Sequence, residues 1–372
     1  MQDTKTNIFA LAKQDTAVLK GIAIIAMLMH HLYGCAPVEY MPDDAILSYV
    51  GDLGKVCVAM FLFCSGYGLS VGYGGLTLDP SPEGEGRLVC IQRNFVITLK
   101  FLVKRFVKFY AGYWPIFLIF VPIGVFIFDR PLSVPYGEDS NILKCLVLDT
   151  LGLQGFSSYN ITWWFNKLII SLYFLFPFLY KWARKNWWSI LLISILAMRL
   201  CYRFKGCFLE DVCLYSCPFV LGILWQQHQE KMNIISQWSL SHGWEMLSVA
   251  MSLLLILLIL RMNPIIPHWT GIRIDGFLAC AIVLCYKSLQ PIISMPKVSL
   301  LAYLGKHSMN IYMIHTFIFS YWFAREIYSC EVVWGGAFFA LLMVCLIISV
   351  VMEWIKEISL YNKLLKFVIN KI

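Results

Sequence analysis

VLKGIAIIAMLMHHLYG, residues 18–34, is an apolar run with two adjacent histidines near its C-terminal end. A stretch of about 20 apolar residues crosses a bilayer as a helix, so this run and its flanks predict a membrane span. An ionisable side chain inside such a span costs roughly 2.5–3.5 kcal/mol, which makes it a functional candidate. His30 and His31 are therefore candidate functional residues.

The composition places the whole chain in the membrane class. Hydrophobic residues make up 59% of the 372 residues and charged residues only 14%, whereas an ordinary soluble domain is about 25% charged. The first ten residues are mostly polar, and we expect no cleavable signal peptide. The net charge of +8 favours no nucleic-acid partner, because the basic residues gather in alternate loops. We expect an all-α fold, a polytopic transmembrane helix bundle that forms a single domain over residues 1–372.

About ten segments are apolar enough to be predicted spans of the lipid bilayer. They cover residues 17–35, 49–73, 109–128, 164–182, 187–203, 211–228, 245–262, 274–290, 307–324 and 332–354. Lys and Arg precede the first span, lie between the second and third and between the fourth and fifth, and recur in the C-terminal tail. Because cytoplasmic loops are enriched in Lys and Arg, this alternation predicts that both termini are cytoplasmic.

Three segments outside these spans also carry a pattern. Residues 74–92 are rich in Gly and Pro and are expected to form a cytoplasmic loop. Residues 95–108 alternate apolar and basic side chains at helical spacing, which predicts an amphipathic helix at the inner interface before the third span. The loop over residues 129–160 is expected to be external and to carry a short surface helix near ILKCLVLDTLG, residues 142–152.

The depth of the histidines can be counted from Lys20. His31 follows Lys20 by eleven residues, which places it about 15 Å above a lysine at the inner interface, near the bilayer midplane. Adjacent side chains on an α-helix point about 100° apart, so the rings of His30 and His31 are expected on different faces, and no metal pair is expected. His315, in LGKHSMNIYMIHTFIF (residues 304–319), lies at a similar depth in another span. Two such histidines predict a polar cavity inside the bundle.

Further polar and aromatic side chains are candidates to line this cavity, although helix packing or an interfacial aromatic belt would also account for them. They are Ser65 and Tyr67 in FLFCSGYGLSVGYGG (residues 61–75), Trp163, Trp164, Asn166 and Lys167 in ITWWFNKLIISLYFLFP (residues 161–177), and Tyr312.

Three basic residues, Lys104, Arg105 and Lys108, stand at the predicted inner mouth of the third span. They either anchor the chain to anionic headgroups or bind an anionic cytosolic ligand. Arg105 suits the second role, because a guanidinium binds a phosphate through two parallel hydrogen bonds.

Five motifs, in chain order, resemble those of the integral-membrane acyltransferase type 3 family. LKGIAIIAMLMHH (residues 19–31) resembles the opening motif, in which a histidine follows the basic residue by eleven positions; that histidine is His31. The other four matching stretches are FLFCSGYGLS (61–70), LVKRFVKFY (102–110), TWWFNKLIISLYFLFP (162–177) and LGKHSMNIYMIHTFIF (304–319). Lys108 departs from the pattern, because arginine is common there. The Trp-Ser-Leu-x-x-Glu motif of members with an esterase-like domain is absent, so a stand-alone member is predicted.

The resemblance implies an O-acyltransferase of the bacterial cytoplasmic (inner or plasma) membrane. Its co-substrate would be cytosolic acyl-CoA, with acetyl-CoA expected, and neither a bound cofactor nor a metal is expected. The acceptor would be a hydroxyl of an envelope saccharide or a similar molecule.

The same resemblance implies roles for the candidate residues. Arg105 and Lys108, together with Lys104, would meet the donor phosphates. His31 would act as general base or carry the acyl group transiently, and His30 would orient it or pack against a neighbouring helix. An alternative is a transporter or flippase of a saccharide or lipid-linked intermediate, which also needs a polar cavity at the midplane but uses no acyl donor.

Overall fold

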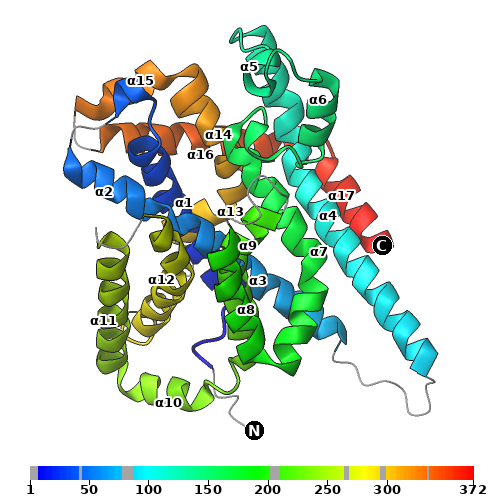
Figure 1. Cartoon of the computed structure of the whole chain (residues 1–372), viewed down its shortest axis with the longest axis vertical. Helices are drawn as coiled ribbons and strands as arrows, with labels where there is room; N and C mark the ends of the chain where they lie inside the picture. The colour runs from blue at the N-terminus through cyan, green and yellow to red at the C-terminus, as the bar shows by residue number, and fades with distance from the viewer. Residues whose placement is uncertain are drawn as a thin grey trace. The chain divides into compact units, whose positions relative to one another are not determined.

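The regular structure is helical throughout the residues that the computed structural model describes (Figure 1). These are residues 7–41, 44–77, 87–201, 209–263, 268–293, 299–332 and 335–372. The chain divides into two compact units. Unit 1 comprises Met1–Met27, Leu53–Gly75 and Phe176–Lys306, and unit 2 comprises Leu28–Asp52, Leu76–Leu175 and His307–Ile372. Neither unit is a continuous stretch of sequence, and the single domain over residues 1–372 stays a prediction.

Six helices among the described residues are long and apolar enough to cross a membrane, so the protein is a helical membrane protein, as its composition predicts. They are Lys13–Gly34, Ala45–Leu76, Gln92–Phe126, Ile161–Lys185, Gly243–Met262 and Gly336–Ile358. The four other predicted spans are also helical where they are described. They correspond to α8 (Trp187–Leu200), α9 (Leu209–His228), α12 (His268–Leu289), and α14 (Ser308–Thr316) with η6 (Phe317–Trp322). The count of ten spans and the cytoplasmic termini stay predictions.

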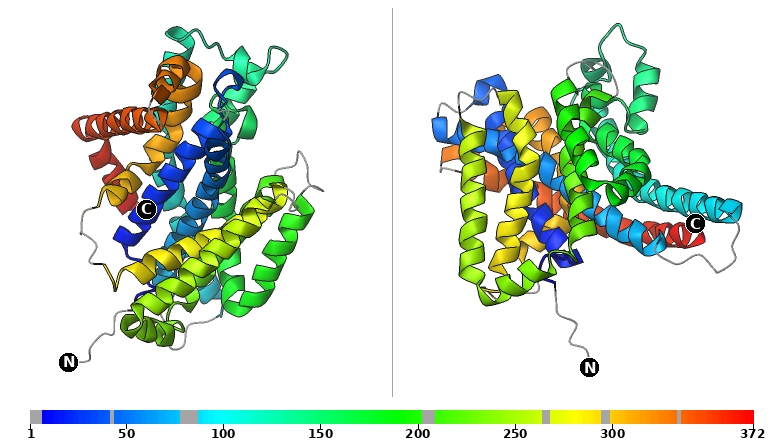
Figure 2. Two further views of the ribbon diagram at one scale, coloured as in Figure 1. Left: turned by 90° about the vertical axis from the view of Figure 1, so that its left-hand side faces the viewer. Right: turned by 60° about the horizontal axis from the view of Figure 1, so that its bottom comes forward.

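Unit 1 holds most of the helices from the middle of the chain. They are most of α1 (Lys13–Met29) and α3 (Val56–Thr77), the C-terminal part of α7 (Trp164–Lys185), α8, α9, α10 (Asn233–Ser241), α11 (Gly243–Met262), α12 and α13 (Leu300–Lys306). Within this unit α11 runs beside α12, and α8 beside α9 (Figures 1 and 2).

Glycines bring α3 and α9 close together. A methyl group at Gly66 would lie 2.2 Å from the carbonyl oxygen of Phe219, and one at Gly222 would lie 2.2 Å from that of Phe63. Neither position therefore has room for a larger residue. Small residues at a crossing are the usual means by which membrane helices approach each other. Gly66, in the predicted glycine-rich span, thus has a packing role.

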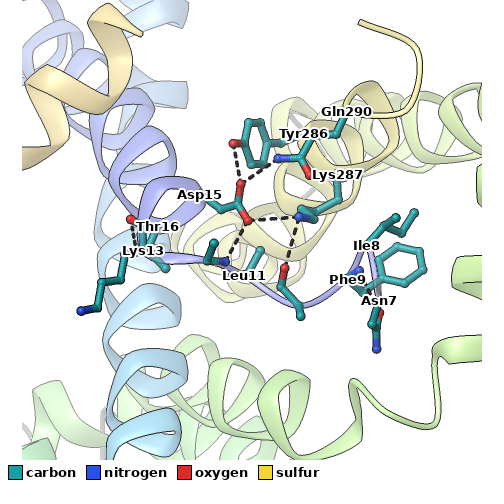
Figure 3. Close-up of polar contacts among 12 residues, drawn as sticks. Asn7, Ile8, Phe9, Leu11, Lys13, Asp15, Thr16, Tyr286, Lys287 and Gln290 are labelled. Atoms are coloured by element: carbon teal, nitrogen blue, oxygen red, sulfur yellow. Dashed lines mark hydrogen bonds and ion pairs between the residues drawn. The ribbon is translucent and has the colours of Figure 1, made fainter. Parts of the chain in front are cut away.

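The carboxylate of Asp15 fixes the N-terminal end of α1 to the C-terminal part of α12 (Figure 3). Its partners are the backbone N–H of Ala12, the Tyr286 hydroxyl, the Gln290 amide and the Lys287 ammonium. The ion pair between Lys287 and Asp15 is 3.1 Å long from Nζ to Oδ2. Both residues are buried, at 3% and 7% exposure, so little water is left to replace a lost partner.

Unit 2 contains the three histidines His30, His31 and His315 and the segments around them. Its elements are η1 (His30–Gly34), η2 (Val38–Tyr40), most of α2 (Ala45–Gly54), α4 (Arg87–Phe126), α5 (Ser133–Tyr136), α6 (Ile142–Thr150), η3 (Gly155–Ser157), η4 (Ile161–Trp163), the N-terminal part of α7, α14, η6, α15 (Ala324–Ser329), η7 (Cys330–Val332), α16 (Gly336–Ile358) and α17 (Tyr361–Lys371).

The helix α4 is continuous where the sequence predicts two elements. The amphipathic segment 95–108 and the span 109–128 were expected to be separate, but one helix of 40 residues runs from Arg87 to Phe126. That expectation was wrong because no proline or glycine lies at the junction to break the helix. Pro115 and Pro122 lie further along, where membrane helices tolerate proline. Residues 78–86, which make up much of the predicted loop 74–92, lie outside the described residues.

The predicted surface helix near residues 142–152 is present as α6, and it carries a buried acid. Asp149 is fully buried, and its carboxylate accepts hydrogen bonds from the Tyr136 hydroxyl at 2.8 Å and the Tyr159 backbone N–H at 2.6 Å. Its backbone carbonyl accepts another from the Tyr113 hydroxyl at 2.7 Å. Burial raises the pKa of the Asp149 carboxyl to about 6, against the opposing effect of these donors.

Lys287→Met tests the buried ion pair. The variant leaves the Asp15 carboxylate without its cation, so the free energy of unfolding should fall by about 3–5 kcal/mol. Asp15→Asn combined with Lys287→Met removes both charges and should recover most of the loss. Thermal denaturation of the full-length protein in detergent measures both effects. A melting temperature of Lys287→Met equal to that of wild type would contradict a stabilising role of the ion pair.

Asp149→Asn tests the buried acid through its pH dependence. The folded state binds the proton of Asp149 more tightly than the unfolded chain, whose carboxyl has its usual pKa of 3.8. The resulting stabilisation is present in full below pH 3.8 and disappears as the pH rises through about 6, a change of about 3 kcal/mol for this group. Melting temperatures of wild type should therefore fall between pH 4 and pH 8 relative to those of Asp149→Asn. Parallel pH profiles of the two proteins would refute the assignment.

Candidate functional site

The adjacent histidines lie where the winding of the first helix changes. α1 ends at Met29, and His30–Gly34 form one π-helical turn. The ring centroids of His30 and His31 are 5.1 Å apart. His30 contacts α2 and His31 contacts α14, and the expectation that the two rings lie on different faces stays a prediction. Single π turns of this kind are frequent at functional sites.

The ring of His30 is held by α2. Its Nδ1 lies 2.8 Å from the carbonyl oxygen of Gly51, and its Nε2 lies 3.5 Å from the sulfur of Cys35. A carbonyl oxygen only accepts, so Nδ1 carries the proton. Gly51 makes this contact possible, since a methyl group there would lie 2.4 Å from the backbone nitrogen of Gly34. His30 is thus held in position beside His31 by its hydrogen bond to α2.

The ring of His31 contacts that of His315, which α14 supplies from near the other end of the chain. The two centroids are 4.7 Å apart and the ring planes are tilted by 51°. His315 is fully buried, whereas His31 is half-buried. The Phe319 ring lies against both, at 6.1 Å from His31 and 5.9 Å from His315. The histidines that the sequence places at similar depths are therefore in contact, and the polar cavity around them stays a prediction.

The backbone of α14 determines where His315 carries its proton. Nδ1 lies 2.8 Å from the carbonyl oxygen of Tyr312 and 3.2 Å from that of Ile311. Both oxygens only accept, so Nδ1 is the protonated nitrogen of the neutral ring, and Nε2 is left as an acceptor. Nε2 lies 3.4 Å from the hydroxyl oxygen of Thr316.

The loop before α7 is fastened to α14 by hydrogen bonds. The amide nitrogen of Asn160 and the indole N–H of Trp163 both donate to the carbonyl of Met313, at 3.2 and 3.1 Å. The hydroxyl of Thr162 donates to Oδ1 of Asn160 at 2.7 Å and lies 3.1 Å from the hydroxyl oxygen of Thr316. A row of polar side chains thus leads from this loop to His315.

The remaining aromatic candidates lie around this loop. The Tyr312 hydroxyl donates to the carbonyl of Thr162, and its ring centroid is 6.3 Å from that of His315. Trp164 stacks on Phe156 with the ring centroids 5.0 Å apart. Tyr312 is therefore a neighbour of the histidine pair. A role for Trp164, or for the half-buried Lys167, in binding an acceptor stays a prediction.

Asn166 is fully buried on α7, and neither atom of its side-chain amide has a hydrogen-bond partner among the described residues. The backbone of Gly152 packs over it, beside the apolar side chains of Ile170 and Phe109. An unpaired buried amide costs about 1–3 kcal/mol, and native structures keep such groups where a ligand or water uses them.

The basic residues of α4 differ in their surroundings. Arg105 is half-buried, its guanidinium lies 4.9 Å from the centroid of the Phe101 ring, and it interacts electrostatically with Tyr173. Within the described part of the chain, Arg105 forms neither a hydrogen bond nor an ion pair. Lys108 is exposed and Lys104 is half-buried. Arg105 is thus a cation whose hydrogen-bond donors remain available to an anion.

Ser65 and Tyr67 lie in unit 1. The Tyr67 hydroxyl donates to Oε1 of Gln229 at 2.9 Å and accepts from the backbone N–H of Leu11 at 2.8 Å, so it is engaged in fixing the N-terminal segment. The predicted cavity role of both residues stays a prediction.

Sequence reasoning did not single out Gly51, Asn160, Thr162 or Thr316. Asn160 had a weak signal, because Asn is a preferred N-cap residue and it does accept from the backbone N–H of Thr162 at 3.0 Å. Thr316 and Gly51 carried no signal, since their importance depends on contacts with distant residues. Over the described ranges, no group of three His, Cys, Asp or Glu residues could hold a metal ion.

Comparison with known families gives one match. A family model described as an acyltransferase domain covers residues 17–354, which include every side chain of the histidine cluster and of the loop fastened to it. Neither the curated proteins nor the solved structures contain a match to the chain.

Asn166→Leu tests the unpaired amide. The substitution removes a buried polar group that has no partner and should raise the free energy of unfolding by about 1–3 kcal/mol. Asn160→Leu is the matched control, because Asn160 is equally buried but both polar atoms of its amide form hydrogen bonds, and the substitution should lower stability. Thermal denaturation of the two variants decides the point. Destabilisation of similar size in both would show that Asn166 is paired.

Proposed function

Because the chain belongs to the acyltransferase type 3 family, we propose that this membrane acyltransferase moves an acyl group, expected to be acetyl, from cytosolic acyl-CoA to a hydroxyl. The acceptor is an envelope saccharide or a similar molecule, and the membrane is the cytoplasmic membrane of a bacterium. The observation that carries the proposal is the contact between His31 and His315, which puts a half-buried imidazole beside a second one within unit 2.

His31 suits the chemistry of acyl transfer in either of two ways. As general base, one of its ring nitrogens takes the proton of the acceptor hydroxyl while the oxygen attacks the thioester carbonyl carbon. The C–S bond then breaks, and the CoA thiolate takes the proton from the imidazolium. As nucleophile, the same nitrogen attacks the thioester carbonyl carbon and the C–S bond breaks, and the CoA thiolate takes the proton of the other ring nitrogen. The acceptor oxygen then attacks the acyl-imidazole, the bond between the acyl carbon and nitrogen breaks, and the hydroxyl proton restores the neutral imidazole. The position of the ring, half-buried beside His315, supports both routes.

Arg105 suits the donor. CoA carries phosphate groups, and a guanidinium binds phosphate through parallel charge-assisted hydrogen bonds. Arg105 has no such partner among the described residues, and Lys104 precedes it directly in the sequence. Arg105 therefore makes the main contact with the donor phosphates, and the exposed Lys108 contributes through longer-range attraction.

The proposal is tested with purified full-length protein in nanodiscs and radiolabelled acetyl-CoA. Wild type should release CoA thiol and place label on the acceptor or on itself. In His31→Ala the rate of CoA release should fall at least 100-fold, because a general base usually contributes that much to the rate. Arg105→Ala should weaken CoA binding by roughly 10- to 100-fold, the value of a hydrogen bond between charged groups, and the difference from wild type should shrink at high salt, which screens the attraction. Lys108→Ala is the matched basic control and should change binding only about two-fold.

Two results would overturn the proposal. Labelling that survives in His31→Ala but disappears in His30→Ala would exchange the roles of the two histidines. Uptake of a saccharide or lipid-linked intermediate by vesicles that contain the protein, without any acyl donor, would replace the transferase by a transporter.

A further inference from the structure

The last helix of the chain, α17, follows α16 almost directly. α16 is one of the helices that are long and apolar enough to cross a membrane, and it ends at Ile358. α17 begins at Tyr361, and between the two helices Leu360 has the left-handed backbone conformation, with φ 58° and ψ 7°. α17 therefore starts at the point where a membrane span comes to its end.

The exposed apolar side chains of α16 follow one side of the helix up to this point. They recur every three or four residues and include Phe339, Met343, Ile347, Val351, Trp354 and Ile358. On a membrane span, such a stripe faces lipid. Trp354 lies about one turn before the end of α16, and tryptophan is enriched at the boundary between hydrocarbon and headgroups. The C-terminal end of α16 is thus at the level of this boundary.

A second exposed apolar stripe lies on α17. Leu364, Phe367 and Val368 recur at intervals of three and four residues, which places them on one side of the helix. Their exposed fractions are 62%, 56% and 38%. The residues that surround α17 leave this side uncovered, although burial of such side chains in an apolar environment is favourable.

A different edge of α17 packs against the protein. Tyr361, Leu365 and Ile369 recur every fourth residue and are half-buried. The Tyr361 hydroxyl donates to the backbone carbonyl of Ala111 on α4 at 3.0 Å, and α17 runs beside α4 (Figure 1). Packing within unit 2 therefore holds α17 in place while its apolar stripe stays exposed.

The charges of α17 are all positive. Lys363, Lys366 and Lys371 are exposed, and residues 361–372 contain neither Asp nor Glu. Over the described ranges, none of the three ammonium groups forms a hydrogen bond or an ion pair. Nζ of Lys371 lies 4.5 Å from the centroid of the Phe367 ring, so this cation is held beside the apolar stripe. α17 thus combines an uncovered apolar side with three positive charges that the described residues leave without a counter-charge.

We propose that α17 lies in the headgroup region of the bilayer and binds anionic lipid. Its apolar stripe enters the boundary of the acyl chains, and Lys363, Lys366 and Lys371 meet the lipid phosphates. Helices with lysines on one side and Leu and Phe on the other bind membranes through apolar burial together with attraction to anionic headgroups. The inference concerns lipid alone and does not depend on acyl transfer.

A second copy of the chain fits the same surface less well. In a symmetric dimer each stripe would contact its equivalent, and the lysines around it would approach those of the partner. Like charges brought together in this way repel, whereas a bilayer with anionic lipids supplies the opposite charge. Charge complementarity therefore favours lipid as the occupant.

Hydrogen–deuterium exchange of the full-length protein in nanodiscs tests the inference. Discs of phosphatidylcholine alone are compared with discs that also contain phosphatidylglycerol, and mass spectrometry follows the amides of residues 361–372. These amides should exchange at least about 10-fold more slowly in the anionic discs, because each lysine near an anionic surface contributes about five-fold in affinity. High salt should reduce the difference, since it screens the attraction.

Two sets of charge variants show whether the lysines of α17 are responsible. Lys363→Gln combined with Lys366→Gln should lose most of the difference between the two kinds of disc. The matched control is Arg184→Gln combined with Lys185→Gln, which removes two exposed charges from the end of α7. This control should keep the wild-type difference.

Val368→Asp tests the apolar stripe. The new carboxylate would have to enter the acyl-chain boundary, so α17 should exchange as fast in anionic discs as wild type does in neutral ones. Asn370→Asp is the matched control, because it adds the same charge about 200° away around the helix, and it should keep most of the protection. Equal exchange in these two variants would overturn the inference.

Two further results would also overturn it. One is exchange of α17 at the same rate in neutral and anionic discs of the wild-type protein. The other is protection that appears only in discs that hold two copies of the chain, which would assign the surface to a second copy.

Discussion

A polar side chain within a bilayer must find its hydrogen-bond partners inside the protein, and the arrangement around His315 depends on this constraint. Two carbonyls of its own helix engage one ring nitrogen, and a threonine supported by the loop before α7 faces the other. His30 meets the same constraint through Gly51. With both neighbours fixed, the half-buried His31 is held between two rings whose orientations their hydrogen bonds determine.

Much of the helical fold could be predicted because it is a local property that apolar runs determine. The depth of His31 in the membrane, counted from Lys20, stays a prediction. The π turn at His30 could not be predicted, since nothing in the letters HHLYG distinguishes it from an α-helical turn and it depends on the contact with Gly51. Thr316 could not be identified either, because its partner Thr162 lies far away in the sequence and only folding brings the two together.

Two buried asparagines near each other in the sequence differ in their hydrogen bonding. Asn160 uses its whole amide to join the loop before α7 to α14, and it serves the fold. Asn166 has no partner in the described residues and weakens the fold. Natural proteins violate packing rules chiefly at functional sites, which is why we propose that Asn166, like Arg105, finds its partner in a bound substrate.

The length of the unbroken α4 can be compared with the thickness of a membrane. Arg105 and Phe126 are separated by about six helical turns, or about 30 Å, which equals the thickness of the hydrocarbon core. With the exposed Phe126 level with one edge of the core, the guanidinium of Arg105 reaches the other edge. We propose that the amphipathic turns that precede Arg105 then lie at the interface, where a soluble donor would meet α4 before it meets the lipid core.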